Sequence, residues 1–523
     1  MKKLKQKIAV LLALCCSVGA FAGCKKGVSA EEKAKTLYVA SINKGYGTDW
    51  LKALLEKFCG DRDLKYKLIP AYEDNAIKSV VESGKGYCDY DLVFTGSRNG
   101  IGDEYLADLT PLVTEYKIES GDRQGKTIKE LLGDELADTF NEEYLFDGEY
   151  YNVLPWTKGM TSLIFNVNVM KETFGENWKE QYPCRTTDEL LECCQALKDK
   201  GKYAFINAGN NTQNGGMYAS VWAQYEGVEG VKDFYNGVYY DETAQEYKEG
   251  PAIMKQQGIL EGLKFMESTM SDGKYVYPES HGYSWEESDT FFMMGYAAMK
   301  YAGDWTQIEN MRNFSNVELE YVRAPITSAL GTKLGITEEQ LIELIDYVDA
   351  VKDGKTATKP AISTADMTTD ELIARVYEAR SLYSSYVDQH TVGVVEYNKK
   401  DLGIEFLKFM ISDEGQGIFF EKSRGLTQPY GYDVEKDDAF ASMNSFAKSR
   451  WMISKDQICV HANGHLRFGS VGLELVPYSK VQPVDSAMAQ GKATAQSVFD
   501  YGYQNVADSW EEITMLVSNK YID

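Results

Sequence analysis

The stretch 36–58, TLYVASINKGYGTDWLKALLEKF, has the pattern of a strand, a glycine turn and a helix. Residues 37–40 form a short apolar run typical of a buried strand. Gly45 and Gly47 allow positive φ and a close backbone approach to a ligand. The apolar side chains that recur at helical spacing are Trp50, Leu51, Leu54, Leu55 and Phe58. The stretch predicts the first unit of an open α/β sheet, where ligands bind at the carboxyl ends of the strands.

Two alternatives stay open for this glycine turn. Its spacing is GxGxxx and not the GxGxxG of dinucleotide sites, so the turn does not predict a nucleotide. It is also compatible with the first turn of an α/β protein that binds nothing there. Strands at 64–69 and 90–94, with a helix at 76–83 between them, continue the pattern. Together they predict a parallel, doubly wound sheet.

Further along the chain, two strands at 150–156 and 162–166 are expected to cross from one half of the protein to the other, and a strand at 318–324 to cross back. Capping boxes predict three helix starts, at Thr186 with Glu189, Thr337 with Gln340 and Thr368 with Glu371. Residues 328–388 have the pattern of an inserted helical segment. Helices are also expected at 218–225, 254–270, 401–411, 487–499 and 506–517.

The composition describes a large exported protein. The 523 residues, 44% of them hydrophobic, suffice for more than one domain. Four lysines followed by the apolar run 8–22 form an export signal that ends in Phe-Ala-Gly-Cys24. This ending is similar to a bacterial lipobox, in which the cysteine is acylated; an ordinary cleaved signal is the alternative. The formal net charge of −24 argues against nucleic acid and anionic lipid as partners.

No motif of an enzyme or a metal site stands out. The chain has no GxSxG, HExxH or Walker pattern in a fitting place, and His461 with His465 would need a third ligand to hold a metal. We therefore expect no cofactor. A glycoside hydrolase stays open as an alternative, because its paired carboxylates have no fixed spacing in sequence. Cysteine pairing is left open for Cys59, Cys88, Cys184, Cys193, Cys194 and Cys459, of which Cys194 is expected to be a buried thiol.

Aromatic residues make up 12% of the chain, with 36 tyrosines and eight tryptophans. The C–H face of a sugar packs on an aromatic ring, and polar side chains at the ring edge meet the hydroxyls. Four tryptophans stand beside polar residues and are candidate platforms: Trp156, Trp222, Trp285 and Trp305. Each is also compatible with an ordinary core position.

These segments together resemble the family 1 extracellular solute-binding proteins of the maltose-binding type. The matching runs are FAGC, GYGTDWLKALLEKF, YDLVF, YLADLTPL, LPW, SLIFN, AAMKYAGDW and EFLKFMISDEG. The resemblance implies an α/β, two-lobed periplasmic-binding-protein type II fold. Each lobe would be a mostly parallel sheet flanked by helices, and crossing strands would join the two. The implied division is a signal peptide 1–23, a tether 24–35, lobe 1 from 36–155 and 322–412 with the insertion 328–388, and lobe 2 from 156–321 and 413–523.

The resemblance also implies a function and a site. We expect a monomer anchored through Cys24 on the extracellular face of the bacterial membrane, which captures an oligosaccharide and delivers it to an ABC permease. A secreted carbohydrate-active hydrolase, or a binding protein for a peptide or cationic solute, is the alternative. The implied ligand-binding residues are Asn43, Lys44, Tyr46, Glu73, Asp74, Ser97, Arg98, Trp156, Tyr218, Trp222, Trp285, Asp304 and Trp305. No catalytic residue and no metal are implied.

Overall fold

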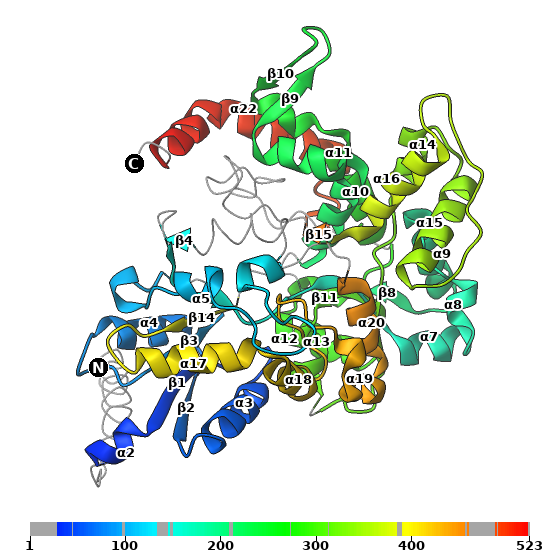
Figure 1. Cartoon of the computed structure of the whole chain (residues 1–523). Helices are drawn as coiled ribbons and strands as arrows, with labels where there is room; N and C mark the ends of the chain where they lie inside the picture. Colours follow the sequence, from blue (N-terminus) through cyan, green and yellow to red (C-terminus); the bar gives the residue numbers. More distant parts are fainter. Residues whose placement is uncertain are drawn as a thin grey trace, which may run out of the picture.

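Two α/β units, each built around its own sheet, form the protein (Figure 1). The computed structural model describes residues 29–43, 45–96, 100–132, 145–146, 150–208, 213–271, 274–311, 313–383, 390–455, 458–459, 487–488 and 490–520. The first sheet has the strand order β2-β1-β3-β14-β6 and the second has the order β12-β7-β11-β8. The predicted two-lobed α/β fold is confirmed.

The first sheet contains the predicted opening units. Its strands are β1 (Thr36–Ile42), β2 (Lys65–Ala71), β3 (Leu92–Thr95), β14 (Thr391–Val394) and β6 (Leu154–Pro155). β1 pairs in parallel with β2 and β3, whereas β14 is antiparallel to both β3 and β6. The helices of this unit include α3 (Asp49–Gly60), α4 (Asp74–Glu82), α5 (Thr110–Thr114), α17 (Lys400–Ile411) and α18 (Asp413–Lys422). Smaller elements are α2 (Ala30–Ala34), η1 (Asp103–Tyr105), β4 (Leu145–Phe146) and β5 (Tyr150–Tyr151).

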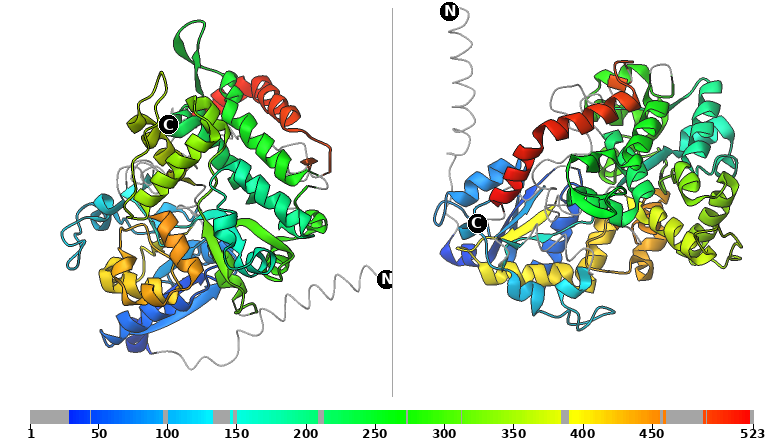
Figure 2. Two further views of the ribbon diagram at one scale, coloured as in Figure 1. Left: turned by 90° about the vertical axis from the view of Figure 1, so that its right-hand side faces the viewer. Right: turned by 90° about the horizontal axis from the view of Figure 1, so that it is seen from above.

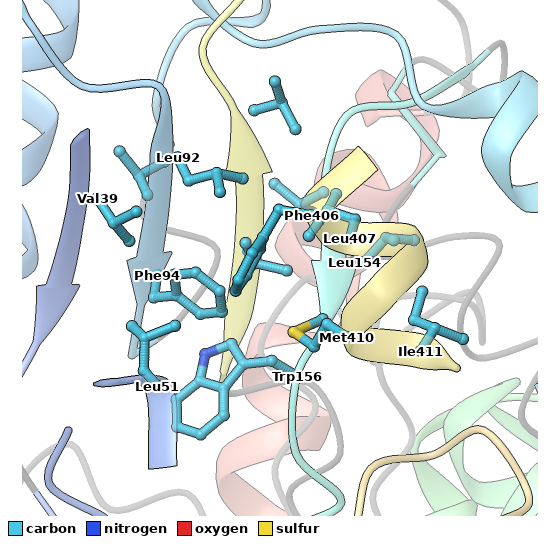
Figure 3. Packing of buried hydrophobic residues seen from close by; sticks show 14 of the residues in the cluster. Val39, Leu51, Leu92, Phe94, Leu154, Trp156, Phe406, Leu407, Met410 and Ile411 are labelled. Carbon is cyan, nitrogen blue, oxygen red and sulfur yellow. The ribbon is translucent and has the colours of Figure 1, made fainter. Parts of the chain in front are cut away.

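The apolar stripe predicted for 50–58 is the face that α3 buries in the core of the first unit. All five of its side chains are no more than 1% exposed. Trp50 stacks on Trp156 with ring centroids 4.5 Å apart. Figure 3 shows Trp156 beside Leu51 and Phe94, with side chains of α17 such as Phe406 filling the space above. Trp156 is 2% exposed and therefore belongs to this core.

The second sheet is mixed. Its strands are β7 (Thr161–Asn166), β8 (Tyr203–Phe205), β11 (Ala297–Gly303) and β12 (Leu319–Val322). β7 lies between β11 and β12 and is antiparallel to both, and β11 is parallel to β8. The surrounding helices are α7 (Val167–Phe174), α8 (Trp178–Gln181), α9 (Thr187–Asp199), α10 (Gln213–Tyr235), η2 (Pro251–Lys255), α11 (Gln257–Met270), η3 (Pro278–Gly282), α12 (Trp285–Met293), α13 (Trp305–Asn310), η4 (Val434–Lys436), α19 (Asp438–Ser442) and α20 (Ser445–Ser454).

Three further features lie on the periphery. A hairpin of β9 (Val238–Asp241) and β10 (Glu246–Glu249) projects from the second unit, and β13 (Leu382–Tyr383) pairs with β15 (Ile458–Cys459) (Figure 1). A single helix, α22 (Ala495–Lys520), packs against α11 (Figure 2). Two separate helices were predicted at 487–499 and 506–517. That break is wrong, because Gly502 and the residues around it stay helical.

The chain crosses between the sheets at one place that was predicted and at others that were not. The first crossing joins β6 to β7 through residues 156–160, as expected. The strand at 318–324 does not cross back, because β12 pairs with β7 in the second sheet. The chain rejoins the first sheet only at β14, and a further passage leads from α18 to α20. The first and last crossing segments contact each other through the bond from Lys158 N to Thr427 O, 2.8 Å long.

The predicted insertion is a helical subdomain with a core of its own. It comprises α14 (Ala329–Leu334), α15 (Glu338–Lys352) and α16 (Thr369–Ser381), and the capping boxes at Thr337 and Thr368 are both formed. This subdomain packs on α10, where Lys333 Nζ donates to Tyr225 O at 2.7 Å. It therefore lies on the second unit, while α18 packs on α3 in the first. The insertion was predicted to belong to lobe 1 and α18 to lobe 2, so the packing of each differs from its predicted lobe. The other domain boundaries stay a prediction.

Within the described ranges, no helix is both long and apolar enough to span a bilayer.

Asp91 connects three segments of the first unit. It is fully buried, and its Oδ2 accepts from Tyr38 N of β1 at 2.8 Å. The same carboxylate accepts from the backbone N of Lys399, at 3.1 Å, and forms an ion pair with its Nζ, at 2.8 Å. These bonds attach the turn before α17 to β1 at the end of the sheet opposite the glycine loop.

We predict that Asp91→Ala lowers the free energy of unfolding by about 3 kcal/mol, because it leaves a buried strand N–H and the partly buried ammonium of Lys399 without their acceptor. Asp89→Ala is the matched control: Asp89 pairs with Lys33 at the surface, where both side chains are about half exposed. Its cost should stay under about 1 kcal/mol. Denaturant titration of both variants measures the difference, and equal costs would contradict the role given to Asp91.

Candidate functional site

A cavity of about 530 Å³ lies between the two units at the carboxyl end of β1. The first unit contributes the glycine loop with the start of α3, and the end of α18 with the turn after it; these residues include Asn43, Asp49, Lys422 and Arg424. The second unit contributes α12 and the segment 308–311. The site is therefore where an open α/β sheet places its ligand, and both units form its walls.

The glycine loop is shaped by a close contact with the second unit. Gly45 and Gly47 have φ of 56° and 61°, a conformation that side chains with a Cβ rarely adopt. A Cβ on Gly45 would also lie 3.4 Å from Cβ of Trp305. The loop thus needs glycine at position 45 for its backbone conformation, since a Cβ there would only come into ordinary contact with Trp305. It carries Tyr46 into the joint between the units, where only 4% of this residue is exposed.

Tyr46 ends on a buried ion pair of the second unit. Its hydroxyl donates to Asp304 Oδ1 at 2.5 Å, and burial followed by this carboxylate raises the pKa of Tyr46 well above its ordinary value. Asp304 Oδ2 accepts from Arg450 Nε at 2.8 Å and from Met160 N at 3.2 Å. Both Asp304 and Arg450 are almost completely buried. The predicted ligand residue Asp304 therefore holds the loop in place.

An aromatic pair forms one wall of the cavity. Trp285 and Trp305 stack with ring centroids 5.5 Å apart and planes 25° apart. Trp285 is the first residue of α12, whose start is fixed by a complete capping box of Ser284 and Glu287. Trp285 lines the cavity, while Trp305 lies behind it. The ring of Tyr46 packs against Trp305 at an interplanar angle of 78°, with ring centroids 6.3 Å apart. Trp285 is thus the ring that a ligand would meet.

The same wall is acidic. Glu286 and Asp289 from α12 and Glu309 from α13 line the cavity beside Trp285. Asp289 forms a buried ion pair with Lys300, a residue whose pKa is lowered by burial. Burial, followed by the negative charge of Asp289, raises the pKa of Glu309 to about 7. The wall therefore holds one carboxylate that titrates near neutral pH.

The structure brings together only part of the predicted site. Asn43, Tyr46 and Trp285 line the cavity; Asp304 and Trp305 lie directly behind it; and Trp156 lies under Tyr46, with ring centroids 5.9 Å apart. Glu73 and Asp74 lie at the start of α4 outside the cavity lining, where Asp74 Oδ1 accepts from Gly96 N at 2.9 Å. Lys44, Ser97, Arg98 and the lipidation residue Cys24 lie outside the described residues.

Tyr218 and Trp222 are not at the cavity. Both belong to the core of the second unit, where Trp222 is fully buried and its Nε1 donates to Gln256 Oε1 at 2.7 Å. The polar residue near Trp222 in the sequence, Gln224, is fully buried as well. Tyr218 lies against α11, where a Cβ on Gly262 would come within 2.4 Å of its ring.

Sequence reasoning missed the acidic wall and Arg450. One signal was available, because Glu309 follows Trp305 by four positions and so shares its helix face. Nothing in the sequence around Arg450 distinguishes it from a surface arginine. Lys422 and Arg424 reach the cavity only because α18 ends there.

Five cysteines are buried thiols, and the side chain of Cys459 lies outside the described part of the structure. Cys59, Cys88, Cys184, Cys193 and Cys194 are all free. Cys194 is fully buried, as predicted. Burial raises the pKa of Cys59 to about 11. In the same part of the chain, no group of three or more His, Cys, Asp or Glu is arranged to hold a metal ion. His461 and His465 lie outside it.

Tyr46→Phe should lower the free energy of unfolding by about 1.5–3 kcal/mol, the range for a hydrogen bond to a charged group, because Asp304 Oδ1 loses a buried donor. The matched control is Tyr66→Phe, which removes an exposed hydroxyl that donates to Glu56 Oε1 at 3.1 Å. The control should cost much less, since water replaces that bond. Denaturant titration compares the two, and a neutral Tyr46→Phe would refute the described joint.

His390 should make the fold sensitive to acid. Its ring lies 4.9 Å from the rings of both Tyr46 and Trp156, and burial lowers its pKa to about 4. Because the unfolded chain binds this proton near pH 6.5, His390 lowers stability as the pH falls from 6.5 to about 4, by up to about 3 kcal/mol. His390→Phe should remove this part of the loss in unfolding measured over that range. An unchanged pH profile would contradict a neutral, buried imidazole.

Comparison with known proteins agrees with this architecture. The profile of the family described as "Bacterial extracellular solute-binding protein" matches residues 44–417, well over half of the chain. A search of curated proteins returned no match. Similar solved structures include a chitin oligosaccharide binding protein, with 14% identity, a TM-score of 0.52 and coverage of 91% of this chain and 98% of that one.

Two others are maltose-bound T. maritima MalE3 and a probable secreted solute-binding lipoprotein from Streptomyces coelicolor, each 13% identical. Their TM-scores are 0.51 and 0.55. The match to MalE3 covers 92% of this chain and 99% of MalE3, and the match to the lipoprotein covers 90% of this chain and 98% of the lipoprotein. At such low identity the likeness shows the fold alone. It extends over nearly the whole chain.

Proposed function

The chain belongs to the bacterial extracellular solute-binding protein family, and we propose that it captures a carbohydrate, specifically an oligosaccharide, in the cavity between its lobes. The observation that carries this proposal is the tryptophan wall. Trp285 lines a cavity of about 530 Å³, a volume within the usual range of small-molecule sites, and is held there by Trp305. A sugar ring stacks on such a face, and the carboxylates and Asn43 at its edge accept or donate hydrogen bonds to hydroxyls.

Similar structures support a sugar as the ligand. Their titles describe a chitin oligosaccharide binding protein, a protein in complex with raffinose and a maltose-bound protein. The two walls of the cavity belong to different lobes here, so a ligand that contacts both stabilises the arrangement in which they are close. The ligand's preference for that arrangement sets how far the population shifts.

We further propose that the captured sugar is handed to an ABC import permease, and that the protein does this as a monomer anchored through a lipid on Cys24 at the extracellular face of the membrane. The family membership and the signal-like residues 1–24 support this part. The proposed role involves binding and release, with no covalent step. Incubation with oligosaccharides and analysis of the products tests that point, since cleavage would contradict it.

The central test is the removal of each stacked ring. A thermal-shift screen with chitin, raffinose-type and malto-oligosaccharides first identifies a ligand, which raises the unfolding midpoint. We expect Trp285→Ala to reduce its affinity by about 1–3 kcal/mol in titration calorimetry, because the platform is lost. Trp305→Ala should have an effect of the same order, and it should also lower stability since this ring packs against Gly45.

The control is Trp451→Ala, which removes a partly exposed tryptophan of α20 whose Nε1 donates to Glu435 Oε1 at 2.9 Å. Its sugar affinity should equal that of the wild type. Unchanged affinity in Trp285→Ala would refute the platform, whatever the stability of the variant.

A further inference from the structure

Three carboxylates gather around the exposed side of the tryptophan wall. Glu286 and Asp289 are three residues apart on α12 and therefore share one face of the helix, and Glu309 reaches the same cavity from α13. Lys300 is the buried cation on this side. When all of these groups are ionised, the wall carries two uncompensated negative charges. The cations Lys422 and Arg424 belong to the opposite lobe.

Asp289 adds an observation that does not depend on charge. Only 2% of this residue is exposed, and its Oδ1 is occupied by Lys300. Its Oδ2 lacks a hydrogen-bond partner within the described part of the chain, although the residue lines the cavity. A buried carboxylate oxygen without a donor is costly, typically by more than 1 kcal/mol. The site therefore contains an acceptor for a donor that the protein itself does not supply.

The ring beside these carboxylates suits a cation. The ammonium of Lys300 already lies 5.6 Å from the centroid of Trp285. A positive charge gains from the face of an indole, and more so where water is excluded. A neutral hydroxyl also fills the vacant acceptor at Asp289. It does not relieve the repulsion among Glu286, Asp289 and Glu309, whereas an ammonium does.

Resting on the function proposed above, we propose that the preferred ligand is a cationic carbohydrate, a sugar that carries a protonated primary amine. The ammonium is seated between Asp289, Glu286 and Glu309, with the sugar ring on Trp285. One of its N–H groups donates to Asp289 Oδ2. The opposite lobe closes over the uncharged face of the sugar.

This arrangement couples binding to protonation. The groups that face Glu309 are Asp289 and Glu286 from α12, Lys300 from β11 and the backbone of Gly45, and the cavity also holds Asp49, Lys422 and Arg424. The pKa of free Glu309 is about 7. A bound ammonium lowers this pKa, so Glu309 releases a proton. Affinity for the amine should fall roughly tenfold from pH 7 to pH 5.5, while the affinity for a neutral sugar should change little.

The test uses the whole chain and three trisaccharide probes in titration calorimetry: a glucosamine trisaccharide, its fully N-acetylated form and maltotriose. We expect the amine form to bind roughly ten- to a hundredfold more tightly than its acetylated form at pH 7, the range for a charge-assisted hydrogen bond. A neutral trisaccharide that binds as tightly as the amine overturns this inference and leaves the proposed function standing. If no trisaccharide binds, the proposed function fails. If spermidine binds as tightly as the amino sugar, the ligand is a polyamine, which overturns the inference.

Glu309→Gln and Glu286→Gln test the placement. Each should reduce the preference for the amine, and Glu309→Gln should also remove the pH dependence. Asp289→Asn is less informative alone, because it leaves Lys300 buried without its partner. Glu242→Gln, in the exposed turn of the β9–β10 hairpin, removes the same charge far along the chain from the wall and should leave both readouts unchanged. Equal effects of Glu309→Gln and Glu242→Gln would overturn the assignment.

Discussion

The buried carboxylate of Asp304 is the constraint on which the site depends. It lies at the end of β11 and binds the glycine loop through Tyr46, the first crossing segment through Met160 N, and α20 through Arg450. Arg450 in turn donates to Lys158 O at 2.5 Å and to Gly425 O at 3.2 Å. Two buried charges pay a large desolvation cost, and only a full set of partners offsets it. Such a cluster therefore tolerates few other arrangements of the segments that meet there.

A continuous series of aromatic rings passes this cluster at Tyr46 and extends from the core of the first unit to the cavity. Trp50 stacks on Trp156, Trp156 contacts the edge of Tyr46, and Tyr46 contacts Trp305, which stacks on Trp285. The first two rings belong to the core of the first unit and the last two to the second. The platform is thus supported from both lobes by packed side chains, which restricts its orientation more than a loop tryptophan would be restricted.

Local sequence patterns predicted the helices and strands, but they did not predict the long-range contacts between them. The β1–α3 unit and the boxes at Thr337 and Thr368 are encoded within a few residues, and the structure contains them. Trp222 misled because its polar neighbour Gln224 is itself fully buried, and its Oε1 accepts from Thr327 N at 3.1 Å. Its indole N–H finds a partner thirty-four positions away in Gln256. Arg450 and the acidic wall depend on contacts between lobes, which sequence spacing does not contain.

The position of Tyr46 also bears on how the lobes can move. It contacts Trp156 and His390, which lie on the segments where the chain leaves and rejoins the first sheet. A rotation of one lobe about these segments displaces the atoms nearest to them least. The bond to Asp304 can therefore persist while the outer rim of the cavity, with Lys422 and Arg424 on one side and Glu286 on the other, opens and closes. Opposite charges at that rim attract as it narrows, and a cation against the acidic wall competes for the same carboxylates. The contact between Tyr46 and Asp304 thus holds the tryptophan pair in one place. The charge of the ligand acts at the rim, where it shifts the equilibrium between the open and closed arrangements of the lobes.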